Sequence, residues 1–123
     1  MQKASQVLRG RRIMIVEDEM LVAMELEALL EEEGCFVVGP APTTARALAL
    51  LDDGLPDAAI LDVNLNGQTA APVAAVLSEQ GVPFLLATGY SQSLQPELRD
   101  APRVSKPVDH GQLVRALTRL LDG

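Results

Sequence analysis

Aromatic residues are scarce in this sequence of 123 residues: they form 2% of it, and tryptophan is absent. A folded core must therefore be aliphatic, and the hydrophobic fraction of 48% is large enough to supply one. No apolar stretch approaches the roughly 20 residues that a membrane-spanning helix needs. The basic start of the chain is also not followed by the apolar segment of a signal peptide. We therefore expect a single soluble domain in the cytoplasm.

Basic residues are outnumbered by acidic ones, 10 to 17, and the formal net charge is -7. A surplus of carboxylates repels the phosphates of nucleic acids, which proteins bind through clustered Lys and Arg. Direct binding of nucleic acid is therefore not expected. Cysteine is represented by Cys35 alone, which excludes an internal disulfide, and we interpret it as a small buried hydrophobic residue.

Five short apolar runs alternate with longer segments of helical spacing, which is typical of a parallel sheet with crossover helices. We predict an α/β fold of the flavodoxin-like, doubly wound type. The expected five-stranded parallel sheet has the order 2-1-3-4-5 and helices on both faces, the common arrangement for a small chain. The domain should span residues 12–123, with residues 1–11 as a lead-in or linker. The predicted strands are residues 13–16, 35–39, 58–61, 83–87 and 103–105.

Helix signals separate these apolar runs. Val22, Leu26 and Leu29 fall at i, i+4 and i+7, the spacing of one helical face. Gly34 ends this helix. Segment 91–100 is polar and contains a proline, so we expect only a short, irregular or mobile element there. The other helices are predicted from an N-cap at Thr43 or Thr44 to Gly54, over residues 68–80, and from a cap at Asp109 onward.

Polar residues follow four of the predicted strands, at the point where each strand ends. Because the carboxyl ends of parallel strands share one edge of a sheet, these side chains should lie close together. Any one of them could serve only as a helix-capping, turn or solvent-exposed residue. Their joint occurrence at the ends of different strands favours a binding site. They are Glu17, Asp18, Glu19, Asp62, Thr88 and Lys106.

Grouped carboxylates need a neutralising partner. Two like charges about 4 Å apart repel by roughly 4 kcal/mol at an effective dielectric constant near 20. Asp18 and Asp62 therefore call for a cation, and Mg²⁺ suits carboxylate, carbonyl and water ligands. Zinc is not indicated, because the only histidine, His110, and the only cysteine are remote from this set. We interpret His110 as a surface residue.

Four segments resemble the marker segments of response-regulator receiver domains: IMIVEDE, AAILDVNLNG, PFLLATGY and RVSKPV. Each alone is weakly specific, but the four in this order and spacing are highly specific, and the resemblance covers essentially residues 12–122. It implies a phosphoacceptor domain of two-component signalling. Its partners would be a histidine kinase or a histidine phosphotransfer protein as donor, and a downstream protein target.

The resemblance also implies roles for individual acidic residues. Asp62 would be the phosphoacceptor, and Asp18 a direct ligand of Mg²⁺. Glu17 would act through a metal-bound water, and Asn64 would supply a backbone carbonyl to the metal. These roles agree with the chemistry, because phosphoryl transfer depends mainly on positioning and charge neutralisation.

Thr88 and Lys106 would contact the phosphoryl oxygens, with a cis bond between Lys106 and Pro107 as in relatives. Arg103 stands where many receivers have an aromatic switch residue. Tyr90 instead follows Thr-Gly, in a sequence that resembles the subgroup nicknamed for its Phe-Ala-Thr-Gly motif. We therefore expect Thr88 and Tyr90 to carry the switch.

Two other functions are weighed against the receiver interpretation. A Mg²⁺-dependent phosphatase with an Asp nucleophile needs an acid two residues after Asp62, where this chain has Asn64. A degenerate receiver that acts only as an interaction module would not need the full polar set. The chain is thus expected not to be an enzyme beyond its own phosphorylation and dephosphorylation. It could be a stand-alone regulator or the C-terminal receiver of a hybrid histidine kinase, with a homodimer through the face of its fourth and fifth helices.

Overall fold

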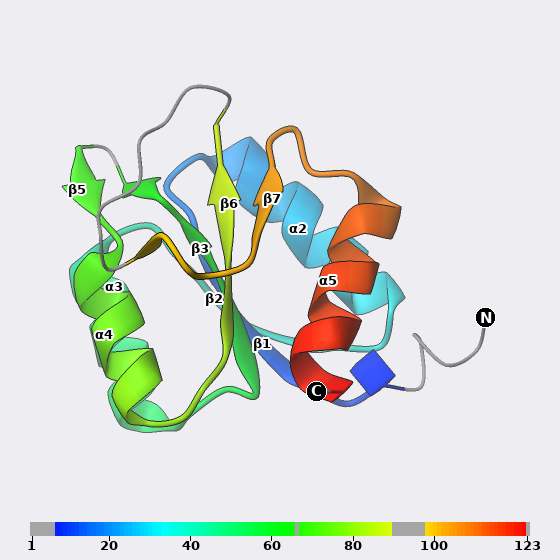
Figure 1. The fold of residues 1–123 in the computed structure, drawn as a ribbon, viewed down its shortest axis with the longest axis horizontal. Coiled ribbons are helices and arrows are strands. Elements are labelled where there is room, and N and C mark those ends of the chain that lie inside the picture. The colour runs from blue at the N-terminus through cyan, green and yellow to red at the C-terminus, as the bar shows by residue number, and fades with distance from the viewer. Residues whose placement is uncertain (1–6, 66, 90–97, 123) are drawn as a thin grey trace.

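The computed structural model of the chain describes residues 7–65, 67–89 and 98–122. The strands of its central sheet are β1 (Arg12–Val16), β2 (Phe36–Ala41), β3 (Ala58–Asp62), β6 (Phe84–Thr88) and β7 (Arg103–Ser105). All neighbours pair in parallel, in the order β2-β1-β3-β6-β7 (Figure 1). This is the predicted order 2-1-3-4-5, so the predicted fold class is confirmed.

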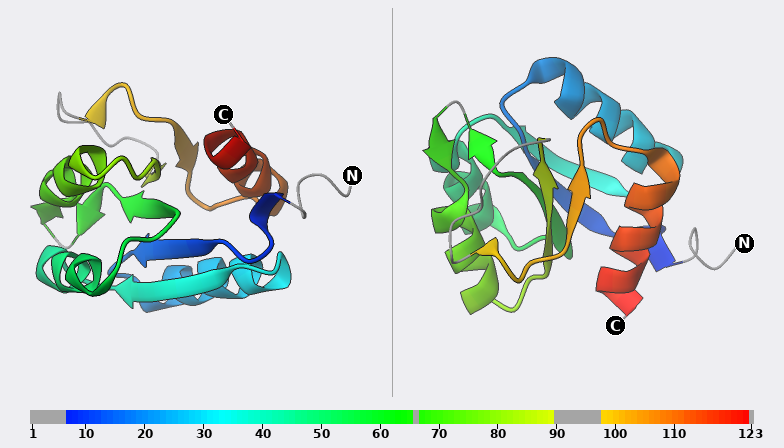
Figure 2. Two further views of the ribbon diagram at one scale, coloured as in Figure 1. Left: turned by 90° about the horizontal axis from the view of Figure 1, so that it is seen from below. Right: turned by 45° about the horizontal axis from the view of Figure 1, so that its top comes forward.

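Helices cover both faces of the sheet. In the described part of the chain they are α2 (Met20–Glu32), α3 (Thr44–Asp53), α4 (Ala71–Glu79) and α5 (His110–Asp122). α3 and α4 lie on one face, and α2 and α5 lie on the other (Figure 1, Figure 2). None of the helices in the described residues has the length and apolar character needed to cross a membrane.

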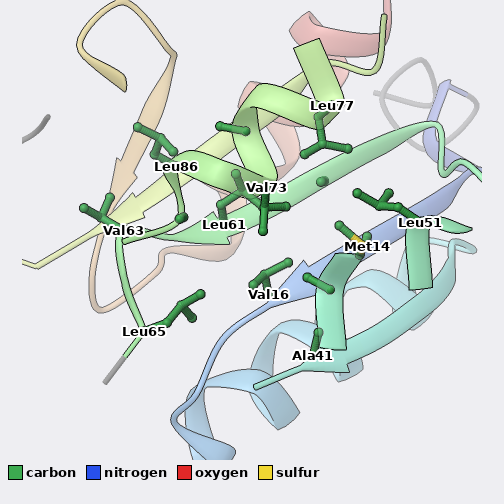
Figure 3. Close-up of a cluster of buried hydrophobic side chains, with 14 of the residues drawn as sticks. Met14, Val16, Ala41, Leu51, Leu61, Val63, Leu65, Val73, Leu77 and Leu86 are labelled. Carbon is green, nitrogen blue, oxygen red and sulfur yellow. The ribbon is translucent and has the colours of Figure 1, made fainter. Parts of the chain in front are cut away.

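Each face of the sheet has its own aliphatic core, because strands of a parallel sheet are buried on both sides. Successive residues of β1 point to opposite faces. Met14 and Val16 enter the core beneath α3 and α4 (Figure 3), whereas Ile13 and Ile15 enter the core beneath α2 and α5. Leu8, which lies in the lead-in before β1, is fully buried in this second core. Leu8 was not among the predicted core residues.

Two predicted helix caps are confirmed. Thr43 Oγ1 accepts a hydrogen bond of 3.1 Å from the N–H of Arg46 at the start of α3. Asp109 Oδ2 accepts one of 2.9 Å from the N–H of Gln112 at the start of α5. Glu19 occupies the N-cap position of α2, but its side chain makes no capping hydrogen bond.

The third predicted helix begins later than expected. Asn64–Leu65 (β4) and Gln68–Thr69 (β5) pair instead as a short antiparallel hairpin. Its turn depends on Gly67, which has a φ of 91° and donates its N–H to Asn64 Oδ1 over 2.9 Å. Thr69 Oγ1 then accepts the N–H of Ala71 at 3.1 Å, where α4 starts. The prediction of a helix from residue 68 is wrong, because apolar spacing does not reveal a turn closed by side chains.

The predicted irregular segment at residues 91–100 lies mostly outside the described residues, and so does Tyr90. Its described end includes Leu98, which is fully buried in the core beneath α3 and α4. The chain then enters β7 at Arg103, as predicted.

Candidate functional site

Glu17 and Asp62 lie side by side at the carboxyl edge of the sheet. β1 and β3 are paired with Val16 beside Leu61, and Glu17 and Asp62 are the next residues. Both are buried, with exposed fractions of 2% and 3%. Buried carboxylates are stable only when they are paired with a cation, hydrogen-bonded or protonated.

Lys106 is the cation that faces these two carboxylates. Its Nζ lies 3.0 Å from Glu17 Oε1 and 3.2 Å from Asp62 Oδ2. The backbone N–H of Lys106 donates a hydrogen bond of 2.8 Å to the carbonyl of Thr88, which joins the ends of β6 and β7. The bond between Lys106 and Pro107 is cis, as predicted. Residues from the ends of four strands of the sheet therefore meet at one place.

Asp18 completes a group of carboxylates that can hold a divalent cation. Oxygens of Glu17, Asp18 and Asp62 lie within 4.8 Å of one another. Among the described residues, no hydrogen-bond donor is aligned on the buried Glu17 Oε1, whose contact is the ion pair with Lys106. Oxygen ligands of this kind fit Mg²⁺ better than zinc or copper. An open cleft of about 460 Å³ borders Asp18, the half-buried member of this group.

The remaining predicted residues flank the carboxylates. Asn64 follows Asp62 by two positions, and its N–H donates a hydrogen bond of 3.2 Å to Asp62 Oδ1. Thr88 is the last residue of β6 and is 8% exposed. It follows Ala87, the residue that pairs with Asp62. Tyr90, the predicted switch residue, lies outside the described residues. The structure thus brings Asn64 and Thr88 to the site.

The electrostatic environment opposes ionisation of Asp62. Its pKa is raised from 3.8 to about 7, mainly by burial and then by the negative charge of Glu17, whereas Lys106 and the N–H of Asn64 lower it. The pKa of Lys106 is raised above 10.5. Burial alone would lower that pKa, but the contacts with Glu17 and Asp62 outweigh burial. The site therefore has an excess of negative charge that Lys106 does not neutralise.

Glu19 belongs to the predicted set of polar residues at strand ends, but no individual role was predicted for it. Glu19 Oε1 lies 3.9 Å from Lys106 Nζ. The sequence signal for an unusual role of Glu19 was a glutamate at the N-cap of a helix, a position that prefers Ser, Thr, Asp and Asn.

The first turns of α2 expose a patch of large apolar side chains, which we call the α2 patch. It comprises Met20, Leu21 and Met24, which are 74%, 77% and 55% exposed.

A second group of ionisable side chains joins the end of α2 to the start of α5. His110 Nε2 lies 3.1 Å from Glu33 Oε2, and His110 Nδ1 lies 3.7 Å from Glu32 Oε1. His110 is thus the surface residue that was predicted, and each of its ring nitrogens faces a different carboxylate. Cys35 lies two positions after Glu33 and is buried. Burial first, and the charge of Glu33 second, raise the pKa of its thiol to about 11. Such a thiol is not an effective nucleophile.

Comparison with known proteins identifies the family. Residues 13–118 match the response regulator receiver domain, which is most of the chain. The chain belongs to this family. As a receiver it shares the five-stranded sheet with solved receiver structures, and the polar strand ends described above lie at the carboxyl edge of that sheet.

This receiver is similar to SdrG from Sphingomonas melonis Fr1, with 46% identity and a TM-score of 0.82 over 91% of this chain and 97% of SdrG. It is also similar to PhyR from Brucella abortus, with 30% identity and a TM-score of 0.82 over 97% of this chain and 51% of PhyR. The transcriptional regulatory protein PdtaR of Mycobacterium tuberculosis is 33% identical over 112 residues, or 87% of this chain and 55% of PdtaR. The chain thus spans about half the length of the curated relatives that it matches.

Proposed function

We propose that this receiver accepts a phosphoryl group on Asp62 and signals through protein contacts. Mg²⁺ would be held by Glu17, Asp18 and Asp62, with the backbone carbonyl of Asn64. The observation that carries the proposal is the setting of Asp62: it is buried, lies 3.2 Å from Lys106, and has two further carboxylates within 4.8 Å. The donor would be a histidine kinase or a histidine phosphotransfer protein.

The proposed reaction transfers a phosphoryl group from a histidine to a carboxylate. An oxygen of Asp62 forms a bond to phosphorus while the bond from phosphorus to the donor's imidazole nitrogen breaks, and the nitrogen keeps the electron pair. When bound, Mg²⁺ supplies positive charge to the phosphoryl oxygens. Lys106 adds a second positive charge from its position 3.2 Å from Asp62 Oδ2. We assign the hydroxyl of Thr88 as a hydrogen-bond donor to the same group.

Asn64 favours storage of the phosphoryl group over rapid turnover. A phosphatase that uses an Asp nucleophile needs a nearby acid to protonate the leaving group and to activate water. The amide of Asn64 cannot do this, and its oxygen is engaged by the N–H of Gly67 at 2.9 Å. We therefore propose that the chain is a phosphoryl carrier and not an enzyme that acts on an external substrate.

The α2 patch is proposed as the docking surface for the phosphoryl donor. A protein donor must bring its phosphohistidine to Asp62, so it has to cover the rim of the site. Met20 directly follows Glu19 on that rim, and apolar side chains as exposed as these stabilise a complex when a partner buries them. The patch therefore supports a protein as the physiological donor.

Acetyl phosphate with Mg²⁺ tests the proposed chemistry directly. We expect an intact-mass increase of one phosphoryl group, and no increase for Asp62→Asn or for wild type with EDTA. Asp100→Asn is a matched control, because Asp100 is an exposed carboxylate in a loop. Labelling of Asp62→Asn would show that the acceptor is another residue, and continuous release of phosphate without a lasting adduct would favour the phosphatase alternative.

Leu21→Ala tests the docking surface separately from the chemistry. With a phosphorylated histidine phosphotransfer protein as donor, we expect transfer to slow, while labelling by acetyl phosphate stays at the wild-type rate. Phe36→Ala is the control, because Phe36 is 66% exposed at the start of β2, on the opposite edge of the sheet. Equal rates for Leu21→Ala and Phe36→Ala with the protein donor would contradict the docking surface.

A further inference from the structure

Glu19 is a third carboxylate on Lys106, and it differs from the other two in its exposure. Its side chain is 67% exposed, whereas those of Glu17 and Asp62 are 1% and 4% exposed. The N–H of Glu19 donates a hydrogen bond of 3.1 Å to Glu17 Oε2, which holds its backbone against the site. Its side chain makes no capping hydrogen bond to α2, and its carboxylate is exposed beside Lys106.

With a divalent cation bound, the charges of the site would balance without Glu19, because the three carboxylates of Glu17, Asp18 and Asp62 would face that cation and Lys106. Glu19 adds a fourth negative charge, and in the described part of the chain it shares Lys106 with the buried carboxylates. An exposed charge beside a binding site changes the local concentration and the approach rate of charged molecules. Because Glu19 Oε1 lies 3.9 Å from Lys106 Nζ, an anionic donor that reaches Lys106 comes close to this carboxylate.

We propose that Glu19 is a specificity-determining residue that selects phosphoryl donors by their charge and by the surface they can bury. This inference rests on the proposed function of Asp62. Small dianionic donors are repelled by Glu19, and apart from the contacts with Lys106 and Mg²⁺ that every donor shares, they have no contact that offsets the repulsion. A protein donor offsets it by burying the α2 patch, which begins at the next residue, Met20. Glu19 thereby limits phosphorylation by free metabolic acyl phosphates.

Two small donors of different charge are suitable probes. Acetyl phosphate is a dianion near neutral pH: an oxygen of Asp62 bonds to phosphorus, the bond from phosphorus to the bridging oxygen breaks, and acetate leaves with the electron pair. Phosphoramidate carries one net negative charge: the bond from phosphorus to nitrogen breaks, and its already protonated nitrogen leaves as ammonia. Both reactions give the same acyl phosphate on Asp62, so only the charge and the leaving group of the donor differ.

The test compares second-order rate constants of phosphorylation with Mg²⁺, measured by intact mass, for wild type and three variants. We expect Glu19→Gln to accelerate labelling by acetyl phosphate about three- to tenfold at low ionic strength, and labelling by phosphoramidate about two- to threefold. Both gains should shrink in high salt, where exposed charges are screened. Glu19→Asp keeps the charge and should react like wild type. Glu31→Gln removes an exposed charge from the far end of α2 and should also react like wild type.

Two outcomes would overturn the inference alone. One is a labelled wild type with equal rate constants for Glu19→Gln and Glu31→Gln. The other is a gain in Glu19→Gln that is equal for the two donors and unaffected by salt, because it would come from the contact with Lys106 and not from the charge that Glu19 presents to the donor. A wild type that takes up no phosphoryl group from either donor would overturn the proposed function, and the inference with it.

Discussion

Replacing the buried carboxylate of Asp62 by an amide should stabilise the protein in the absence of metal. Asp62 is 3% exposed, and its pKa is raised from 3.8 to about 7 by burial first and by the charge of Glu17 second. The native protein therefore holds a proton that the unfolded chain releases above its own, lower pKa. Stability from this group is full below about pH 4 and is lost as the pH rises toward 7. Asp62→Asn has no such loss.

The size of the effect follows from the change in pKa. A rise from 3.8 to about 7 corresponds to an upper limit of about 4 kcal/mol at alkaline pH. Solvent screening and relaxation around the cleft reduce this value, so we expect Asp62→Asn to be about 1–3 kcal/mol more stable than wild type at pH 8. For a domain of this size, that difference raises Tm by roughly 4–10 °C. Near pH 4 the two proteins should be equally stable.

Thermal unfolding followed by circular dichroism is the suitable assay, because the chain has no tryptophan. Wild type, Asp62→Asn and Asp100→Asn are compared with EDTA from pH 4 to pH 8. Asp100 is an exposed loop carboxylate, so its variant should follow wild type throughout. The reasoning is refuted if the difference between Asp62→Asn and wild type does not grow with pH, or if Asp62→Asn is the less stable protein at pH 8.

Three further predictions concern metal binding and packing. Mg²⁺ at millimolar concentration should raise the Tm of wild type more at pH 8 than at pH 5.5, because protons compete with the metal for Asp62, whose pKa is about 7. An equal gain in Tm at both pH values would contradict this prediction. Leu8→Ala should lower the free energy of unfolding, measured by urea titration, by about 2–3 kcal/mol, because Leu8 is fully buried. Leu55→Ala, at a residue that is 42% exposed, should lower it much less. Asp109→Ala should cost about 1 kcal/mol through the lost cap of α5, and an unchanged urea midpoint would show that the cap does not contribute.

Local patterns in the sequence were sufficient for most of the fold. The alternation of apolar runs and helical spacing predicted the five strands of the sheet, because burial on both faces leaves continuous apolar runs in parallel strands. The cap at Asp109 was predicted correctly and that of α3 was predicted as Thr43 or Thr44, of which Thr43 is the cap, since capping is a contact between residues three positions apart. The start of the third helix was not, because the hairpin at β4 and β5 depends on side-chain hydrogen bonds and on Gly67, which apolar spacing does not record.

The sequence by itself determined the fold class and the set of polar residues at strand ends, because both follow from periodicity and from the shared edge of parallel strands. Only the tertiary structure decided how those residues act on one another. Burial and the neighbouring Glu17 raise the pKa of Asp62. Lys106 contacts both Glu17 and Asp62, which lie at the ends of different strands. The exposed position of Glu19 beside Lys106 was equally undetermined by sequence, because a distance of 3.9 Å across 87 positions of the chain exists only after folding.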